Sequence, residues 1–181
     1  MTTTPTPVWR IKVVLQGTRP AVWRRFDTCS TVTLSQLHYF IQGAMGWELA
    51  HLFTFHGELG RFEISNSAVL ANACRLGDSL LYVYDFGDHW EHLVTVEKVI
   101  KRRAGVIYPR CVAGGNTCPP EDCGGPWGYA DMLKTLAGRR NARRRELVEW
   151  LGGSFDPKCF DLDEANERLA EYAQVSTPEP Q

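Results

Sequence analysis

The densest set of side chains that could do chemistry lies in the segment Tyr84–His92, which reads Tyr-Asp-Phe-Gly-Asp-His-Trp-Glu-His. Asp85, Asp88 and His92 are the candidate ligand-pocket residues, because carboxylates and imidazoles bind metal ions and exchange protons. With a metal ion, these three side chains would suit a metal-assisted hydrolase. The structural alternative is a hairpin in which the two aspartates accept hydrogen bonds from turn amides and Gly87 takes a positive φ.

A second group consists of three cysteines in a stretch rich in glycine and proline. Cys111, Cys118 and Cys123 are separated by six and four residues, which is not the paired Cys-x-x-Cys spacing of common zinc motifs. Thiolates are good zinc ligands, and a bound ion can order an irregular loop. The sequence therefore predicts a zinc site formed by these cysteines with His92 as the fourth ligand. The alternative is a loop held by packing, with buried and inert thiols.

A third group is basic. Arg139, Arg140, Arg143, Arg144 and Arg145 form a run with no acidic residue inside it. Such a run is typical of a solvated helix face, and it could also contact the phosphates of a nucleic acid. The whole chain has 20 basic and 21 acidic residues and a net charge of -1, so a generally basic, nucleic-acid-binding surface is not indicated.

The first half of the chain predicts one sheet with one helix. Alternating apolar residues indicate strands, and a capping-box pair, Thr33 and Gln36, begins a helix over Leu34–Met45 that Gly46 ends. On the last of these strands, Trp90, His92, Val94 and Val96 share one face. The predicted strands are Val8–Leu15, Ala21–Thr28, His51–His56, a short run ending at Ile64, Leu80–Tyr84 and Trp90–Val99.

The second half is predicted to be an irregular segment, 101–127, followed by helices. The helical segments are Tyr129–Leu136, Arg143–Leu151 and Leu162–Gln174, the last with Asp161 as its N-cap. We expect one domain over residues 8–174, with disordered tails at 1–7 and 175–181. The predicted fold class is α+β: a single mixed sheet, one helix packed across it in a β-grasp-like arrangement, and a C-terminal helical segment. Two sheets forming a small barrel are the alternative.

The chain has 181 residues, of which 44% are hydrophobic, which suffices for one packed core. No run of 18 apolar residues is present, so a transmembrane helix is not expected. The first residues lack the basic and apolar regions of a signal peptide, and we therefore expect a cytoplasmic protein.

Several motifs, in one order along the chain, resemble the plasmid Ri ORF-three-like family, also labelled as insertion-element passenger proteins of the TnpR type. These motifs are Val22-Trp23-Arg24-Arg25, Leu37-His38, Gln42-x-x-Met45-Gly46-Trp47, His51-Leu52, Tyr84-Asp85-Phe86-Gly87-Asp88-x-Trp90-x-His92, Tyr108-Pro109-x-Cys111, Cys118-Pro119-Pro120-Glu121-Asp122-x-Gly124-Gly125-x-x-Gly128-Tyr129, Trp150 and Phe155-Asp156-Pro157.

The resemblance implies an α+β fold with a single sheet and no established activity. The nucleophilic serine that a serine recombinase needs near its N-terminus is missing, because the first strand offers Trp9-Arg10-Ile11-Lys12. We therefore expect a non-catalytic binding or accessory module, linked to mobile DNA, whose partner is a nucleic acid or a protein. The hydrolase at Asp85, Asp88 and His92 is the alternative.

Overall fold

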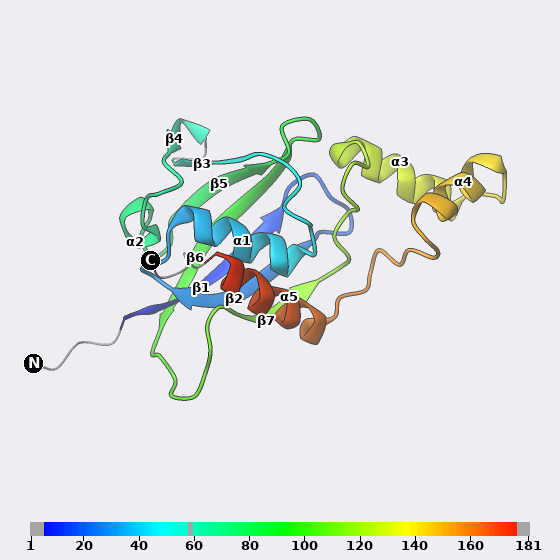
Figure 1. Ribbon diagram of the computed structural model, residues 1–181. Helices are drawn as coiled ribbons and strands as arrows, with labels where there is room; N and C mark the ends of the chain where they lie inside the picture. The colour runs from blue at the N-terminus through cyan, green and yellow to red at the C-terminus, as the bar shows by residue number, and fades with distance from the viewer. Residues whose placement is uncertain (1–5, 58–59, 177–181) are drawn as a thin grey trace, which may run out of the picture.

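The computed structural model describes residues 6–57 and 60–176, and the strands of these residues form one sheet of seven. The order across the sheet is β4-β3-β5-β6-β1-β2-β7 (Figure 1). The described strand pairs are all antiparallel, so the predicted mixed sheet is wrong; the β-grasp-like arrangement is not confirmed, and the two-sheet barrel is not observed. The strands are β1 (Val8–Leu15), β2 (Trp23–Cys29), β3 (Phe53–Gly57), β4 (Phe62–Ile64), β5 (Ser79–Tyr84), β6 (Trp90–Ile100) and β7 (Arg110–Gly115).

Helix α1 (Leu34–Met45) lies across one face of this sheet, as the sequence predicts (Figure 1). The amide of Gln36 donates to the Thr33 hydroxyl at 3.1 Å, and the Gln36 side-chain carbonyl accepts from the Thr33 amide at 3.0 Å. Gly46 ends the helix with a φ of 89°. The capping box and the glycine stop are therefore both confirmed.

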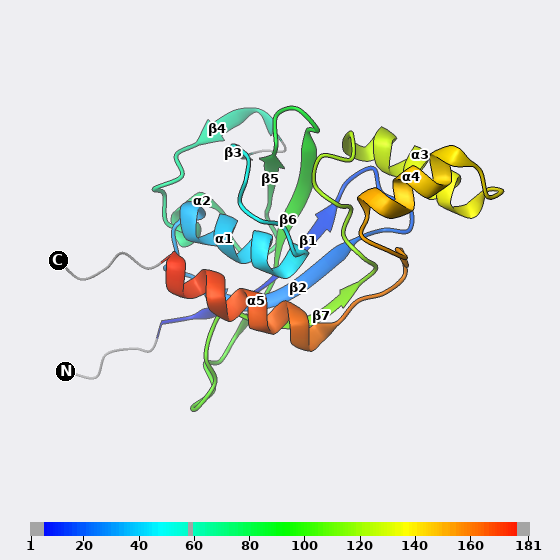
Figure 2. The same ribbon diagram turned by 45° about the vertical axis from the view of Figure 1, so that its right-hand side comes forward.

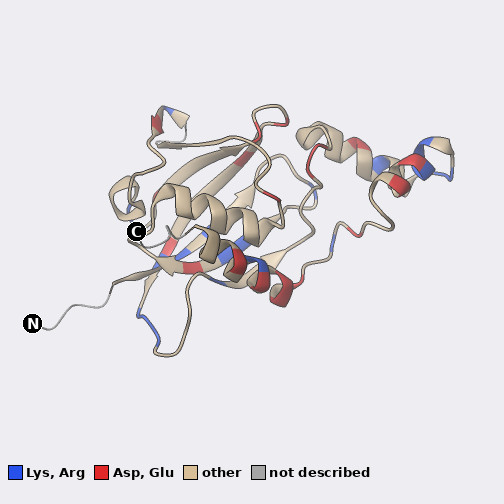
Figure 3. Ribbon diagram, viewed as in Figure 1, with Lys and Arg blue, Asp and Glu red and all other residues tan. Residues whose placement is uncertain are grey.

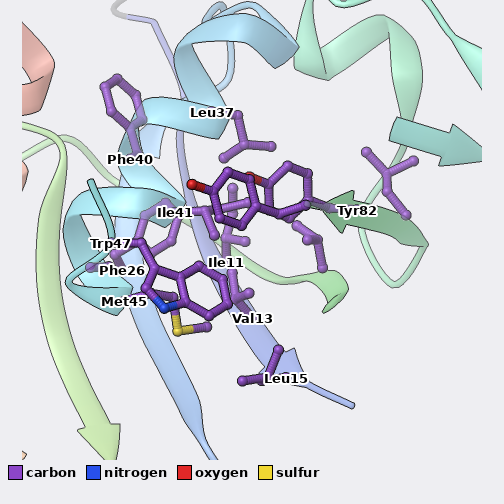
Figure 4. Close-up of a cluster of buried hydrophobic side chains, with 14 of the residues drawn as sticks. Ile11, Val13, Leu15, Phe26, Leu37, Phe40, Ile41, Met45, Trp47 and Tyr82 are labelled. Atoms are coloured by element: carbon purple, nitrogen blue, oxygen red, sulfur yellow. The ribbon is translucent and has the colours of Figure 1, made fainter. Parts of the chain in front are cut away.

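The core lies between α1 and the sheet. Trp90, His92, Val94 and Val96 are buried along β6, so the predicted shared face is confirmed. Apolar side chains of β1 and β2 meet the inner face of α1 there (Figure 4). The side chains labelled in that view are Ile11, Val13, Leu15, Phe26, Leu37, Phe40, Ile41, Met45, Trp47 and Tyr82.

The segment 101–127 is not irregular throughout, because it contains the edge strand β7, which the sequence analysis missed. Glycines interrupt the alternation of apolar and polar residues that would indicate a strand. Neighbouring side chains leave no room for a Cβ atom at Gly114 and Gly115, which explains why glycine stands there. A Cβ atom on Gly114 would lie 2.5 Å from the Phe160 ring, and one on Gly115 would lie 2.6 Å from Nε1 of Trp23. Tertiary contacts thus demand residues that local strand propensity disfavours.

Three longer helices follow. Helix α5 (Leu162–Val175) lies beside α1 on the same face of the sheet, whereas α3 (Gly125–Ala137) and α4 (Ala142–Trp150) form a hairpin that projects from one side (Figure 2). All three predicted C-terminal helices are therefore present, and α5 is the one that lies on the sheet beside α1. The remaining helix is the single turn α2 (Leu70–Ala73).

Parts of both predicted tails belong to the described structure. The carbonyl of Pro7 accepts a hydrogen bond from the Ser30 amide at 3.0 Å, and Val175 is the last residue of α5. The other predicted tail residues, 1–5 and 177–181, lie outside the described residues.

Candidate functional site

The predicted ligand pocket of Asp85, Asp88 and His92 does not form one site. Asp85 lies in the β5–β6 turn with a φ of 56°, and its Oδ1 accepts hydrogen bonds from the amides of Gly87 (2.9 Å) and Asp88 (3.3 Å). Asp88 faces elsewhere, and its Oδ2 accepts from the Gly124 amide at 3.0 Å. The geometry agrees with the hairpin alternative for Asp85, whereas Asp88 accepts from an amide outside the turn, and Asp85 and His89, not Gly87, take positive φ.

His92 lies in the core below Trp47. Its ring is fully buried, and Nδ1 lies 3.1 Å from the Trp90 carbonyl oxygen. The Trp47 and His92 rings meet edge to face, with centroids 5.3 Å apart. Burial lowers the pKa of His92 to about 3, so the ring is neutral. The register of β6 turns this side chain inward, away from the turn that carries Asp85 and Asp88.

His51 takes the place that the sequence analysis gave to His92. Its Nε2 atom lies 3.7 Å from Oδ2 of Asp85 and 3.3 Å from Oδ1 of Asp122. In the described residues, these three form the one group of His, Cys, Asp and Glu whose ligand atoms all lie within 4.8 Å of one another. Sequence spacing could not reveal the group, because three separate turns supply its members. The His51-Leu52 and Glu121-Asp122 motifs were the available signals.

Tyr84, the last residue of β5, connects two of these turns. Its hydroxyl donates to Oε1 of Glu121 at 2.5 Å and accepts from the amides of Ala50 (3.1 Å) and His51 (3.3 Å). Oε2 of Glu121 in turn accepts from the Glu48 amide at 2.9 Å. Burial and the Glu121 carboxylate both raise the pKa of Tyr84, which keeps the hydroxyl protonated as the donor. The positions of His51 and Asp122 are thus coupled through one side chain.

A cleft of about 810 Å³ begins beside Glu121 and Asp122 and runs between the end of α1 and the start of α5. Five of its lining residues are acidic and two are arginines. Trp47 forms part of the wall, and Trp150 at the end of α4 is 52% exposed at the rim. The acidic residues are Glu48, Glu121, Asp122, Asp161 and Glu164, and the basic ones are Arg24 and Arg168.

Arg24 lies within the wall of the cleft and serves the fold. Its Nε donates to the carbonyl oxygen of Ala44 at 2.7 Å, near the end of α1. Its Nη1 donates to three further carbonyl oxygens, those of Trp23, Gly115 and Asn116. Desolvation lowers the pKa of this guanidinium, and among the described residues it has no carboxylate partner. The charge of Arg24 is therefore stabilised by four carbonyl dipoles. The other arginine of the cleft, Arg168, donates from Nη1 to the carbonyl oxygen of Gly46 at 3.3 Å.

The four predicted zinc ligands do not come together. The Cys111 thiol points at the carbonyl oxygens of Arg25 and Ala113, each 3.5 Å away, and His92 lies in the core. No three of the predicted ligands have ligand atoms within 4.8 Å of one another in the described residues. Burial raises the pKa of Cys111 and Cys118 and raises that of Cys123 to about 12, so the thiols are protonated. The geometry agrees with the alternative of buried thiols for Cys111 and Cys118, whereas Cys123 is partly exposed.

The basic run lies on the projecting hairpin, and two of its arginines have internal partners. Arg143 pairs with Asp131 of α3, and Nε of Arg144 donates to the carbonyl oxygen of Leu136 at 2.9 Å. The other three are exposed: Arg139 and Arg140 lie between α3 and α4, and Arg145 lies on α4. Basic residues occur at this end of the hairpin (Figure 3). The proposed phosphate-contacting patch is therefore reduced to these three side chains.

The fold and the motifs agree with known proteins. Residues 7–164 match the family described as plasmid pRiA4b ORF-3-like protein. The chain belongs to this family. A curated relative, the uncharacterized protein y4hQ of Sinorhizobium fredii, is 34% identical over 92% of this chain and 92% of its own length. The crystal structure of MM3350, a protein of unknown function from Methanosarcina mazei Go1, superposes with a TM-score of 0.82 at 36% identity, covering 89% of this chain and 98% of that chain.

The ORF-3-like proteins found by these comparisons are uncharacterised and indicate no catalytic function. These comparisons do not support the hydrolase alternative at Asp85, Asp88 and His92. The structure gives a second reason, because it separates the three side chains. Among the described residues, no helix combines the length and apolar character needed to cross a bilayer.

Proposed function

We propose that this ORF-3-like domain is a binding module whose cleft receives a basic peptide segment of a partner protein. The observation that carries the proposal is the acidic excess of the cleft lining, five carboxylates against two arginines. Both arginines are already engaged, Arg24 by carbonyl groups and Arg168 by Glu164 and the Gly46 carbonyl. Of the five carboxylates, Glu48, Asp122 and Asp161 pair with no lysine or arginine in the described residues, so these three are available to the basic side chains of a ligand.

The surroundings of the cleft support the same ligand chemistry. Helix α5 adds further acidic residues next to it, Asp163, Glu167 and Glu171, and acidic side chains gather along α5 and the neighbouring segments (Figure 3). The half-exposed Trp150 offers an aromatic face on which a guanidinium group can stack. Acidic rims raise the association rate of basic partners, and this contribution weakens with salt.

The test is a titration of the protein with a short peptide rich in arginine and lysine, followed by Trp fluorescence. We expect saturable binding that weakens with added salt, and a loss of at least ~10-fold in affinity in the double variant Glu48→Gln, Glu164→Gln. Glu63→Gln on β4 is the matched control, because Glu63 is exposed and does not line the cleft. Equal affinity in the double variant and the control would contradict the proposal.

A link to mobile DNA is a second candidate function, favoured by Arg139, Arg140 and Arg145 at the end of the hairpin. No carboxylate partner holds these three side chains in the described residues. Replacement of all three by alanine should weaken binding to duplex DNA and reduce the salt dependence of the binding that remains. Arg75→Ala, at an exposed position outside the hairpin, is the control. Absence of DNA binding at low salt in the unaltered protein would exclude this function.

A further inference from the structure

We propose that His51, Asp85 and Asp122 bind one divalent transition-metal ion, for which Zn²⁺ is the matching probe. This site differs from the cysteine site predicted from the sequence and does not depend on the proposed peptide binding. One imidazole nitrogen and two carboxylate oxygens are a ligand set that zinc accepts, and three protein ligands leave at least one coordination position open.

The spacing of the three side chains suits a common ion. In a tetrahedral zinc site with bonds of about 2.0–2.2 Å, neighbouring ligand atoms are about 3.3–3.6 Å apart. Nε2 of His51 lies 3.3 Å from Oδ1 of Asp122 and 3.7 Å from Oδ2 of Asp85, and all three ligand atoms are within 4.8 Å. Both distances from His51 are within a few tenths of an ångström of the values for such a site, and the two carboxylate oxygens lie no more than 4.8 Å apart.

A buried nitrogen of His51 without a hydrogen bond supports the site independently of these distances. Nε2 of His51 is buried from solvent and makes no hydrogen bond, although two carboxylates lie next to it. The Asp85 side chain is 10% exposed, and its Oδ2 has no hydrogen-bond donor. A buried nitrogen without a partner is costly, and neither Asp85 nor Asp122 pairs with a Lys or Arg in the described residues. A metal ion placed between them would satisfy all three groups.

The fold holds the ligands in advance. Oδ1 of Asp85 is fixed by the amides of Gly87 and Asp88, which leaves Oδ2 directed toward His51. Such hydrogen bonds to a ligand's second oxygen orient it for the metal. The Tyr84 hydroxyl holds the His51 amide on one side and Glu121, the neighbour of Asp122, on the other. A bound ion would therefore join the loop that carries Asp122 to the β5–β6 turn.

The first experiment measures zinc binding to the full chain after treatment with a chelator. Calorimetric titration with Zn²⁺ should give one equivalent, and the melting temperature should rise with bound zinc. His51→Gln and Asp122→Asn should each weaken binding at least tenfold; Asp122 is exposed, so its replacement leaves the fold intact. His89→Gln is the matched control, because Nε2 of His89 lies 3.3 Å from a single carboxylate, Glu91, with no third ligand.

The second experiment identifies the ligand type with Co²⁺ as the probe. A visible spectrum without thiolate-to-cobalt charge transfer, lost in His51→Gln, would support the site. Charge-transfer bands that disappear in the double variant Cys111→Ser, Cys118→Ser would place the metal at the cysteines and overturn the proposal. Failure to bind Zn²⁺, or equal binding in His51→Gln, Asp122→Asn and the control, would also overturn it.

Discussion

The hydroxyl oxygen of Tyr82 on β5 lies 2.7 Å from Nδ1 of His38 on α1, in the fully buried layer between helix and sheet. Gln42 donates to the same hydroxyl at 3.0 Å, so the tyrosine proton is left for the histidine. His38 also stacks on Phe53, with ring centroids 3.6 Å apart. The hydrogen bond from the Tyr82 hydroxyl needs an unprotonated Nδ1 on His38, and hence a neutral imidazole. Burial lowers the pKa of His38 to about 3, which keeps the ring neutral.

The first prediction follows from these buried histidines. The pKa of His38 and that of His92 are both lowered to about 3, whereas an unfolded chain has histidines near 6.5. Below pH 6.5 the unfolded state binds protons that the folded state does not, so the free energy of unfolding decreases as the pH falls toward 3. Between pH 7 and pH 5 we expect a loss of roughly 2 kcal/mol per histidine.

Urea unfolding at several pH values measures this effect. His92→Leu should reduce the slope of stability against pH by about one proton, whatever its effect on stability at pH 7. Leu52→Ala, which changes an exposed side chain that does not titrate, should leave the slope unchanged. A His92→Leu protein with the slope of the unaltered chain would contradict the assignment.

The second prediction concerns two adjacent arginines of β2. Arg24 is 4% exposed and donates to four carbonyl oxygens, so Arg24→Met should lower the free energy of unfolding by roughly 2–4 kcal/mol. Arg25 is partly exposed on the opposite face and pairs with Glu97 at 2.6 Å. Arg25→Met should cost less than about 1 kcal/mol. Denaturant unfolding compares the two variants, and similar losses would contradict the role of Arg24.

The third prediction compares two glycines with nearly equal φ angles. Gly125 (φ 67°) and Gly152 (φ 69°) are both left-handed. A Cβ atom on Gly125 would lie 2.4 Å from the Asp88 carbonyl oxygen, whereas nothing lies within 4 Å of one on Gly152. Gly152→Ala should therefore cost only the roughly 1–2 kcal/mol of the backbone conformation, and Gly125→Ala clearly more. Thermal unfolding of both variants measures the difference, which should vanish if the close approach of α3 to the β5–β6 turn is wrong.

The fourth prediction is an order of thiol reactivity. Cys159 is exposed, whereas Cys111 and Cys118 are buried and burial raises the pKa of both thiols. Because the thiolate is the reactive form, a disulfide reagent should modify Cys159 first in the native protein. Cys159→Ser should remove the fast phase, and Cys118→Ser should retain it. A fast phase that survives unchanged in Cys159→Ser would contradict this order of reactivity.

Local pattern was sufficient for the elements whose signals lie within a few residues. Thr33 and Gln36 define the start of α1, Gly46 defines its end, and the alternation on β1 and β6 separates core from surface. These features depend on helix capping and on side-chain periods of 3.6 and 2, which any short window contains. The single sheet and the covering helix could be predicted on this basis, whereas the family was indicated by the resemblance of its motifs along the chain.

Only the tertiary structure showed that residues 110–115 form strand β7 and that His51, Asp85 and Asp122 lie together. The glycines of β7 are explained by Phe160 and Trp23, which belong to distant parts of the chain. The inward side of β6 takes His92 away from Asp85 and Asp88, while the turns at His51 and Asp122 meet Asp85 through the hydrogen bonds of Tyr84. The sequence by itself indicated Asp85 as a candidate ligand, but neither His51 nor Asp122. Which side chains meet depends on strand order and register, which are set by non-local packing.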